Sequence, residues 1–142
     1  MTIGCFEFVS FPELGLSEVM AKVDTGAYSG ALHCTDIKVV RRGPDRKRIL
    51  KYKPHGHPEL SEEAETFYET NVRSALGQRK KRYIIETTIE LKGERYPITI
   101  GLSDRSDMKS PVLLGRRFLR ENNILVDVRV NSEYDDEGEN TK

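Results

Sequence analysis

Short runs rich in β-branched and aromatic residues, separated by glycine, proline or charged turns, recur along this chain of 142 residues. Partial alternation of apolar and polar residues in such runs is typical of half-buried strands. The strands predicted in this way are Cys5–Phe11, Val19–Val23, Ala31–Val40, Arg48–Tyr52, Arg82–Leu91, Arg95–Leu102, Pro111–Leu114 and Ile124–Val130. The pattern predicts an all-β fold, and many short strands in one domain favour a closed β-barrel.

Two segments differ from this strand pattern. Gly115–Asn122 (GRRFLREN) predicts one short helix near the C-terminus. The polar segment 53–71 predicts an inserted loop, with a short helix that starts at Ser61 because serine caps helix N-termini well. We therefore expect one domain over residues 1–130, including this loop, and an acidic, disordered tail over residues 131–142.

The overall charge gives no attraction to nucleic acid or membranes, because 23 basic residues balance 23 acidic ones. There is no RNA-binding motif, no signal-peptide pattern and no apolar run of the roughly 18 residues that a membrane span needs. Only two cysteines occur, which suits a reducing compartment. We expect a cytoplasmic protein with no membrane partner and no nucleic-acid partner. The basic stretches Arg41–Lys53 and Arg79–Arg82 would suit an acidic peptide, or form a solvated charged face.

The stretch Ala21–Gly30 (AKVDTGAYSG) carries the clearest chemical signal, since Asp24 follows an apolar strand and precedes a glycine turn. One interpretation of Asp24 is a hydrogen-bonded turn residue. The other is half of a catalytic pair, because two adjacent aspartates share one proton and can act together as base and acid. The chain supplies one Asp-Thr-Gly, so the second carboxylate requires Asp24 of another copy across a two-fold axis.

Asp24-Thr25-Gly26-Ala27 together with Leu113-Leu114-Gly115-Arg116 resembles the retropepsin-like aspartic proteases. Phe11–Gly15, Ser29–His33 and Asp104–Met108 extend the resemblance to one bacterial family, which is associated with ribosomal modification and labelled "ATP-dependent zinc protease". The resemblance implies a closed barrel of the acid protease type and a homodimer that hydrolyses peptide bonds. Relatives lie beside ligases that add glutamates to a ribosomal protein, so acidic, glutamate-rich peptides are candidate substrates.

The resemblance also assigns roles to individual residues. Asp24 would be the catalytic acid–base, supported in its loop by Thr25, Gly26 and Ala27. The structural neighbours of the site would be Leu114, Gly115 and Arg116. Arg105 would either pair with a carboxylate near the site or brace a loop. The hairpin that covers the substrate is expected at Arg41–Tyr52 or Val72–Tyr83.

Two other functions stay open. His55 and His57 are two residues apart and could bind zinc with His33 or Cys34, which would give a zinc-dependent hydrolase. The chain has no H-E-x-x-H, no C-x-x-C and no phosphate-binding loop, so we expect no zinc, no ATP and no other cofactor. The second alternative is a non-catalytic barrel that binds peptide or RNA.

Overall fold

The computed structural model describes residues 1–55, 61–73, 76–105 and 109–135. In these residues strands predominate, and α-helix is limited to α1 (Arg116–Glu121). The strands are β1 (Thr2–Ile3), β2 (Phe6–Phe11), β3 (Leu16–Val23), β4 (Ala31–Arg42), β5 (Lys47–Pro54), β6 (Glu62–Ala64), β7 (Tyr68–Arg73), β8 (Arg79–Leu91), β9 (Glu94–Ser103), β10 (Val112–Leu114) and β11 (Leu125–Val126). Two 3-10 helices are η1 (Pro12–Leu14) and η2 (Ser132–Tyr134). The all-β class and the single short C-terminal helix are confirmed.

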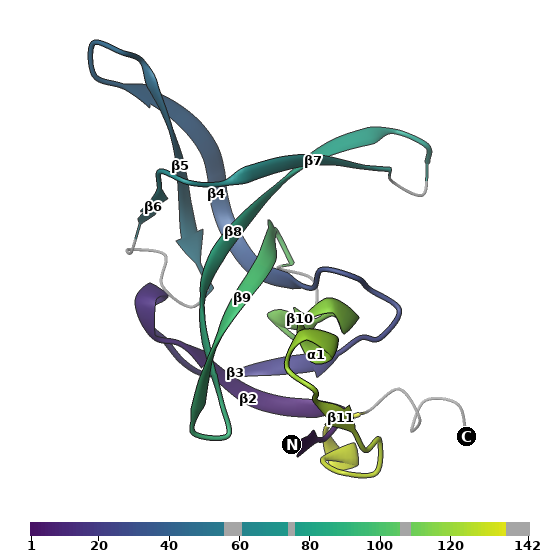
Figure 1. Cartoon of the computed structure of the whole chain (residues 1–142). Coiled ribbons are helices and arrows are strands. Elements are labelled where there is room, and N and C mark those ends of the chain that lie inside the picture. The colour runs from purple at the N-terminus through teal and green to yellow at the C-terminus, as the bar shows by residue number, and fades with distance from the viewer. Residues whose placement is uncertain (56–60, 74–75, 106–108, 136–142) are drawn as a thin grey trace.

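Six of these strands close into a barrel (Figure 1). Their hydrogen-bonded order is β10-β3-β2-β8-β9-β4, and β4 pairs again with β10. The short β10 closes the ring because both of its edges are used. It runs parallel to β3, with Leu114 opposite Val23, and antiparallel to β4, with Val112 opposite Leu32. The closed barrel of the retropepsin-like type is thereby confirmed.

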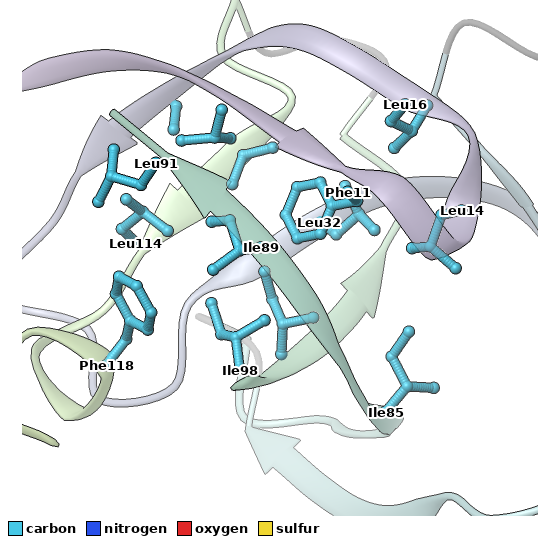
Figure 2. Packing of buried hydrophobic residues seen from close by; sticks show 14 of the residues in the cluster. Phe11, Leu14, Leu16, Leu32, Ile85, Ile89, Leu91, Ile98, Leu114 and Phe118 are labelled. Carbon is cyan, nitrogen blue, oxygen red and sulfur yellow. The ribbon is translucent and has the colours of Figure 1, made fainter. Parts of the chain in front are cut away.

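The barrel is filled by apolar side chains from every one of its strands. Part of this cluster is shown in Figure 2, where Phe118 of α1 lies next to Leu114 at one end of the cluster. Leu32, Ile89 and Leu114 are completely buried. Each such side chain contributes roughly 1.5–3 kcal/mol relative to an exposed position. The same packing fixes β10 and α1, the two elements that lie against the Asp24 loop.

Hairpins connect several pairs of neighbouring antiparallel strands. The β4–β5 and β7–β8 hairpins extend beyond the barrel (Figure 1). The β8–β9 hairpin turns at Lys92 and Gly93, both with positive φ, which suits a two-residue hairpin turn. Glu94 already belongs to β9, so this strand begins one residue before the predicted Arg95.

The helix expected from Ser61 is wrong, because Glu62–Ala64 forms β6 and pairs with β5. The next strand, β7, pairs with β8. Acidic side chains of this segment form ion pairs with the basic β4–β5 hairpin. These ion pairs stabilise the extended conformation of the segment relative to a local helix. These pairs are Arg42–Glu63, Lys47–Glu65 and Arg48–Glu69. Residues 56–60 of the expected loop lie outside the described residues.

The last predicted strand, Ile124–Val130, is shorter than expected. Only Leu125–Val126 forms a strand, because its partner β1 is two residues long. The chain then turns: the Val130 N–H donates to the Asp127 carbonyl over 3.0 Å, and the Arg129 N–H donates to Asp127 Oδ1, also over 3.0 Å.

The expected tail begins with ordered chain, since η2 forms at Ser132–Tyr134 and Asn131 Nδ2 donates to the Phe6 carbonyl over 2.7 Å. Residues 136–142 of that tail lie outside the described residues. The domain limits 1–130 and 131–142 stay predictions. Among the described segments, no helix has the length and apolar character to cross a membrane.

Candidate active site

Asp24 lies at the point where β3 ends and a tight turn begins. Its N–H donates to the Leu114 carbonyl over 2.9 Å, and its own carbonyl accepts from the Ala27 N–H over 3.1 Å. The first bond continues the parallel pairing of β3 with β10, which places Leu114 opposite Val23. The Asp24 backbone is therefore held by two hydrogen bonds, one to the buried strand β10 and one within its own turn.

The Asp24 carboxylate is half-buried and oriented by one backbone donor. Oδ1 accepts a hydrogen bond from the Gly26 N–H over 3.0 Å. A Cβ placed on Gly26 would lie 3.2 Å from the same Oδ1, so glycine suits this close approach. Within the described residues, Oδ2 has no hydrogen-bond partner. The carboxylate thus has one oriented oxygen and one that can bind a water molecule or a second carboxyl group.

Arg116 ties helix α1 to the Asp24 loop. Its Nη1 donates to the carbonyls of Thr25 and Gly26 over 3.3 and 3.0 Å, and its N–H donates to the Ala27 carbonyl over 2.9 Å. Its guanidinium lies 5.5 Å from the centre of the Tyr28 ring, a cation–π distance. The residues predicted to support the Asp24 loop and the residues predicted to neighbour the site are thus brought together around one turn.

Arg105 lies two residues after the end of β9, in the segment that leads toward β10. Its backbone N–H donates to His33 Nδ1 over 2.7 Å, and its Nε donates to the Ser110 carbonyl over 3.3 Å. These contacts brace the segment after β9 against β4 and the approach to β10. These two contacts fit loop bracing, and the pairing of Arg105 with a carboxylate stays a prediction.

The described residues do not fit a zinc site. His33 Nδ1 accepts a hydrogen bond from the Arg105 backbone N–H over 2.7 Å, so its lone pair is already engaged. Asp104 Oδ1 lies 3.8 Å from the same nitrogen. The His55 ring centre is 5.2 Å from that of His33, and burial raises the Cys34 pKa to about 12, which keeps it a thiol. His57 lies outside the described residues.

Beside the Asp24 loop lies a groove that the sequence did not predict. It is lined by Thr25, Arg116, Leu119, Arg120, Asn123, Ile124, Leu125 and Val126. Leu125 is 69% exposed there, although leucine is normally buried. The sequence did contain a signal for this groove, namely the apolar run that follows the helix. A helix of six residues is too short to cover most of that apolar surface. The groove places exposed apolar surface next to the proposed catalytic residue.

Comparisons with known proteins agree with this geometry. The family model described as "Retropepsin-like aspartic endopeptidase RimB" matches residues 2–135. Curated relatives named probable alpha-L-glutamate ligase come from Shewanella pealeana, 30% identical over 128 residues, and Parasynechococcus marenigrum, 31% identical over 130 residues. Each match covers 88% of this chain but 28% and 27% of the relatives, so the chain spans under a third of their length.

A solved structure supports the same assignment. The crystal structure of a Legionella pneumophila protein of unknown function matches with a TM-score of 0.71 and 27% identity, covering 91% of this chain and 94% of the other. The family model spans the barrel, the Asp24 loop and helix α1 alike. The chain therefore belongs to the RimB-like family of retropepsin-like aspartic endopeptidases.

Proposed function

We propose that the protein is an aspartic endopeptidase that cleaves peptide bonds with a pair of Asp24 residues, one from each subunit of a homodimer. The observation that carries the proposal is the Asp24 carboxylate itself, half-buried at the end of β3 with Oδ1 held by the Gly26 N–H. An aspartate that served only as a turn residue would not need support from β10, Arg116 and helix α1.

The proposed reaction needs no covalent intermediate. One ionised Asp24 removes a proton from water, whose oxygen attacks the peptide carbonyl carbon. The protonated Asp24 of the partner subunit donates its proton to the carbonyl oxygen, which gives a tetrahedral diol. The diol collapses when the C–N bond breaks: the Asp24 that took a proton from water gives it to the leaving nitrogen, and the Asp24 of the partner subunit takes back a proton from a diol hydroxyl. Because two close carboxylates share one proton, the pair supplies both the base and the acid.

The groove beside the Asp24 loop supports a second copy as the missing half of the site. Leu119, Ile124 and Leu125 contribute apolar surface next to Thr25, and exposed apolar surface of this kind marks interaction sites. A two-fold axis close to Thr25 would bury this surface and bring the two Asp24 carboxylates together.

The proposed substrates are peptides or proteins, including glutamate-rich ones, and the proposed location is the cytoplasm. The names of the curated relatives support a link to glutamate chemistry, although those proteins are much longer. The β7–β8 hairpin is the better candidate for the substrate cover. Arg82 at its base lies 3.0 Å from where a Cβ on Gly101 would be, and the Gly30 carbonyl at the end of the Asp24 loop lies 3.5 Å from that point.

The test combines mass in solution with peptide cleavage, for the wild type and Asp24→Asn. We expect both to be dimers, and Asp24→Asn to lose at least ~10²-fold in kcat because one charge-neutral amide cannot act as base or acid. Retained cleavage in Asp24→Asn would exclude the dyad. Loss of cleavage on adding a metal chelator would favour the zinc hydrolase. A monomer that binds peptides without cleaving them would favour the non-catalytic barrel.

A further inference from the structure

Strand β9 ends at Ser103, but its two neighbours in the barrel continue past this point. The last β8–β9 pair is Tyr83 with Leu102, and the last β4–β9 pair is His33 with Ser103. Beyond these pairs, β8 continues as Arg79–Arg82 and β4 as residues 34–42. In the described part of the chain, no strand pairs with either of them on the edge that β9 occupied. Two unpaired strand edges therefore border the place where β9 stops.

A hollow lies between these two strands beyond the end of β9. Neighbouring strands lie about 4.8 Å apart, so β8 and β4 are separated by about twice that distance where β9 still lies between them. The hollow, of about 300 Å³, opens just beyond and is here named the β8–β4 slot. It is lined by Cys34, Thr35, Asp36, Ile37, Lys80, Lys81, Arg82, Tyr83, Leu102, Ser103 and Asp104. An extended segment in this slot would continue the line of β9 and hydrogen-bond to both edges.

The side chains of β8 give the slot a positive face. Lys80 and Arg82 are two residues apart and lie on the same face of the strand. Neither forms an ion pair or side-chain hydrogen bond with another described residue. Lys81 belongs to the opposite face, where its Nζ lies 3.6 Å from Glu69 Oε2. Two cations spaced by a strand repeat are therefore available to a ligand.

A second hollow continues this surface past Asp36, which lines both. It adds Lys38, Lys51 and Lys53, and the Lys53 Nζ lies 3.3 Å from Asp36 Oδ2. Together the two hollows are lined by six basic residues and two acidic ones, Asp36 and Asp104, although Lys81 is paired with Glu69 and Lys53 with Asp36. At the β4–β5 hairpin, Arg42, Lys47 and Arg48 form ion pairs with Glu63, Glu65 and Glu69. Along the two hollows, Lys38, Lys51, Lys80 and Arg82 form no ion pair with another described residue.

We propose that the β8–β4 slot binds an extended acidic peptide segment by strand addition, as a docking site distinct from Asp24. The segment pairs its backbone with the free edges of β8 and β4, and acidic side chains at alternate positions face Lys80 and Arg82. Cross-strand neighbours approach within about 4.5–5.5 Å at Cβ, which allows direct ion pairs. Binding at this site requires no peptide cleavage and does not depend on the dyad.

The test uses the full chain with Asp24→Asn, so that the probe stays intact. The probe is a fluorescein-labelled octapeptide of alternating glutamate and threonine, and the matched control probe replaces each glutamate by glutamine. Fluorescence anisotropy should show binding of the acidic probe, with affinity that falls as salt rises. Lys80→Gln with Arg82→Gln should weaken it about tenfold, since each exposed ion pair is worth up to about 1 kcal/mol. Arg95→Gln, at the other end of the β8–β9 hairpin, should leave binding unchanged.

Two peptides that are N-methylated at alternate residues, one in each phase, test the backbone pairing. At least one of them should lose binding, because a methylated nitrogen cannot donate to a strand edge. Equal affinity for the glutamate and glutamine probes, or unchanged binding after both N-methylations, would overturn the proposal. If Arg95→Gln weakens binding as much as Lys80→Gln with Arg82→Gln does, the binding reflects general surface charge, which would also overturn the proposal. The catalytic proposal is decided separately, by cleavage with Asp24 intact.

Discussion

Gly30 and Gly115 meet backbone to backbone beneath the Asp24 loop. A Cβ placed on Gly30 would lie 3.0 Å from the Gly115 nitrogen and 2.4 Å from the Leu113 carbonyl oxygen. A Cβ placed on Gly115 would lie 2.6 Å from the Gly30 nitrogen and 2.5 Å from the Tyr28 carbonyl oxygen. Any side chain at either position would push the loop away from β10 and α1.

Gly30→Ala should therefore destabilise the protein by about 2–4 kcal/mol, through both crowding and its φ of +60°. Gly93→Ala is the matched control, because Gly93 also has a positive φ, +79°, but nothing lies within 4 Å of its added Cβ. The control should lose only about 1 kcal/mol. Urea denaturation measures both, and equal losses would mean that close packing at Gly30 contributes nothing.

Arg116→Met should loosen the Asp24 loop, because it removes the donor to the carbonyls of Thr25 and Gly26. We expect a loss of about 1.5–3 kcal/mol in the free energy of unfolding, together with faster hydrogen exchange at the Gly26 and Ala27 amides. Arg120→Met on the same helix is the control, since Arg120 is exposed and its side chain bonds to no described residue. Unchanged exchange in Arg116→Met would show that the turn holds its shape without the guanidinium.

Thr87→Val should stabilise the protein by about 1 kcal/mol. The Thr87 hydroxyl is buried in the barrel wall and has no hydrogen-bond partner among the described residues, so it is desolvated without compensation. Thr88→Val, the neighbouring control, should have the opposite effect because the Thr88 hydroxyl donates to Glu13 Oε1 over 2.5 Å. Thermal unfolding measures both. A lower melting temperature for Thr87→Val would mean that the hydroxyl is satisfied in solution.

Cys34 should be inert toward Ellman's reagent at pH 8 in the folded protein, whereas Cys5 should react. Burial raises the Cys34 pKa from 9.0 to about 12, so almost no thiolate forms at pH 8. Between pH 9 and 12 the folded state binds more protons at Cys34 than the unfolded state does. Stability should therefore fall as pH rises through this window, by at most about 1.4 kcal/mol per pH unit. Cys34→Ala should lack the slope between pH 9 and 10 and keep part of it above pH 10, because burial also raises the Tyr52 pKa. Rapid labelling of Cys34 at pH 8 would contradict the burial.

The sequence predicts those elements whose local pattern agrees with their tertiary surroundings. Strands β4, β5, β8 and β9 carry apolar residues for the core, and turn residues stand between them. This pattern can be recognised from the sequence alone. Asp24 was identifiable because its turn needs glycine at a fixed spacing. The fold class follows from the number of such strands.

The strands that were missed depend on distant partners. Glu63 and Glu69 look like residues of a polar loop until Arg42 and Arg48 are brought beside them by the β4–β5 hairpin. Conversely, Asp127 lies in an alternating run that favours a strand, but its side chain and carbonyl form a turn instead. The groove beside Thr25 combines residues from three separate segments, which no local pattern encodes.

The pairing of Val112 with Ala21 and Leu32 has a consequence for biosynthesis. The strand that closes the barrel is made long after the two strands that it joins, and contacts between such distant segments form slowly. A nascent chain that carries Asp24 but has not reached Arg116 lacks both β10 and the arginine that orders the loop. A partly made barrel therefore lacks the contacts that orient the Asp24 carboxylate, and these contacts can form only after residues 112–116 have been synthesised.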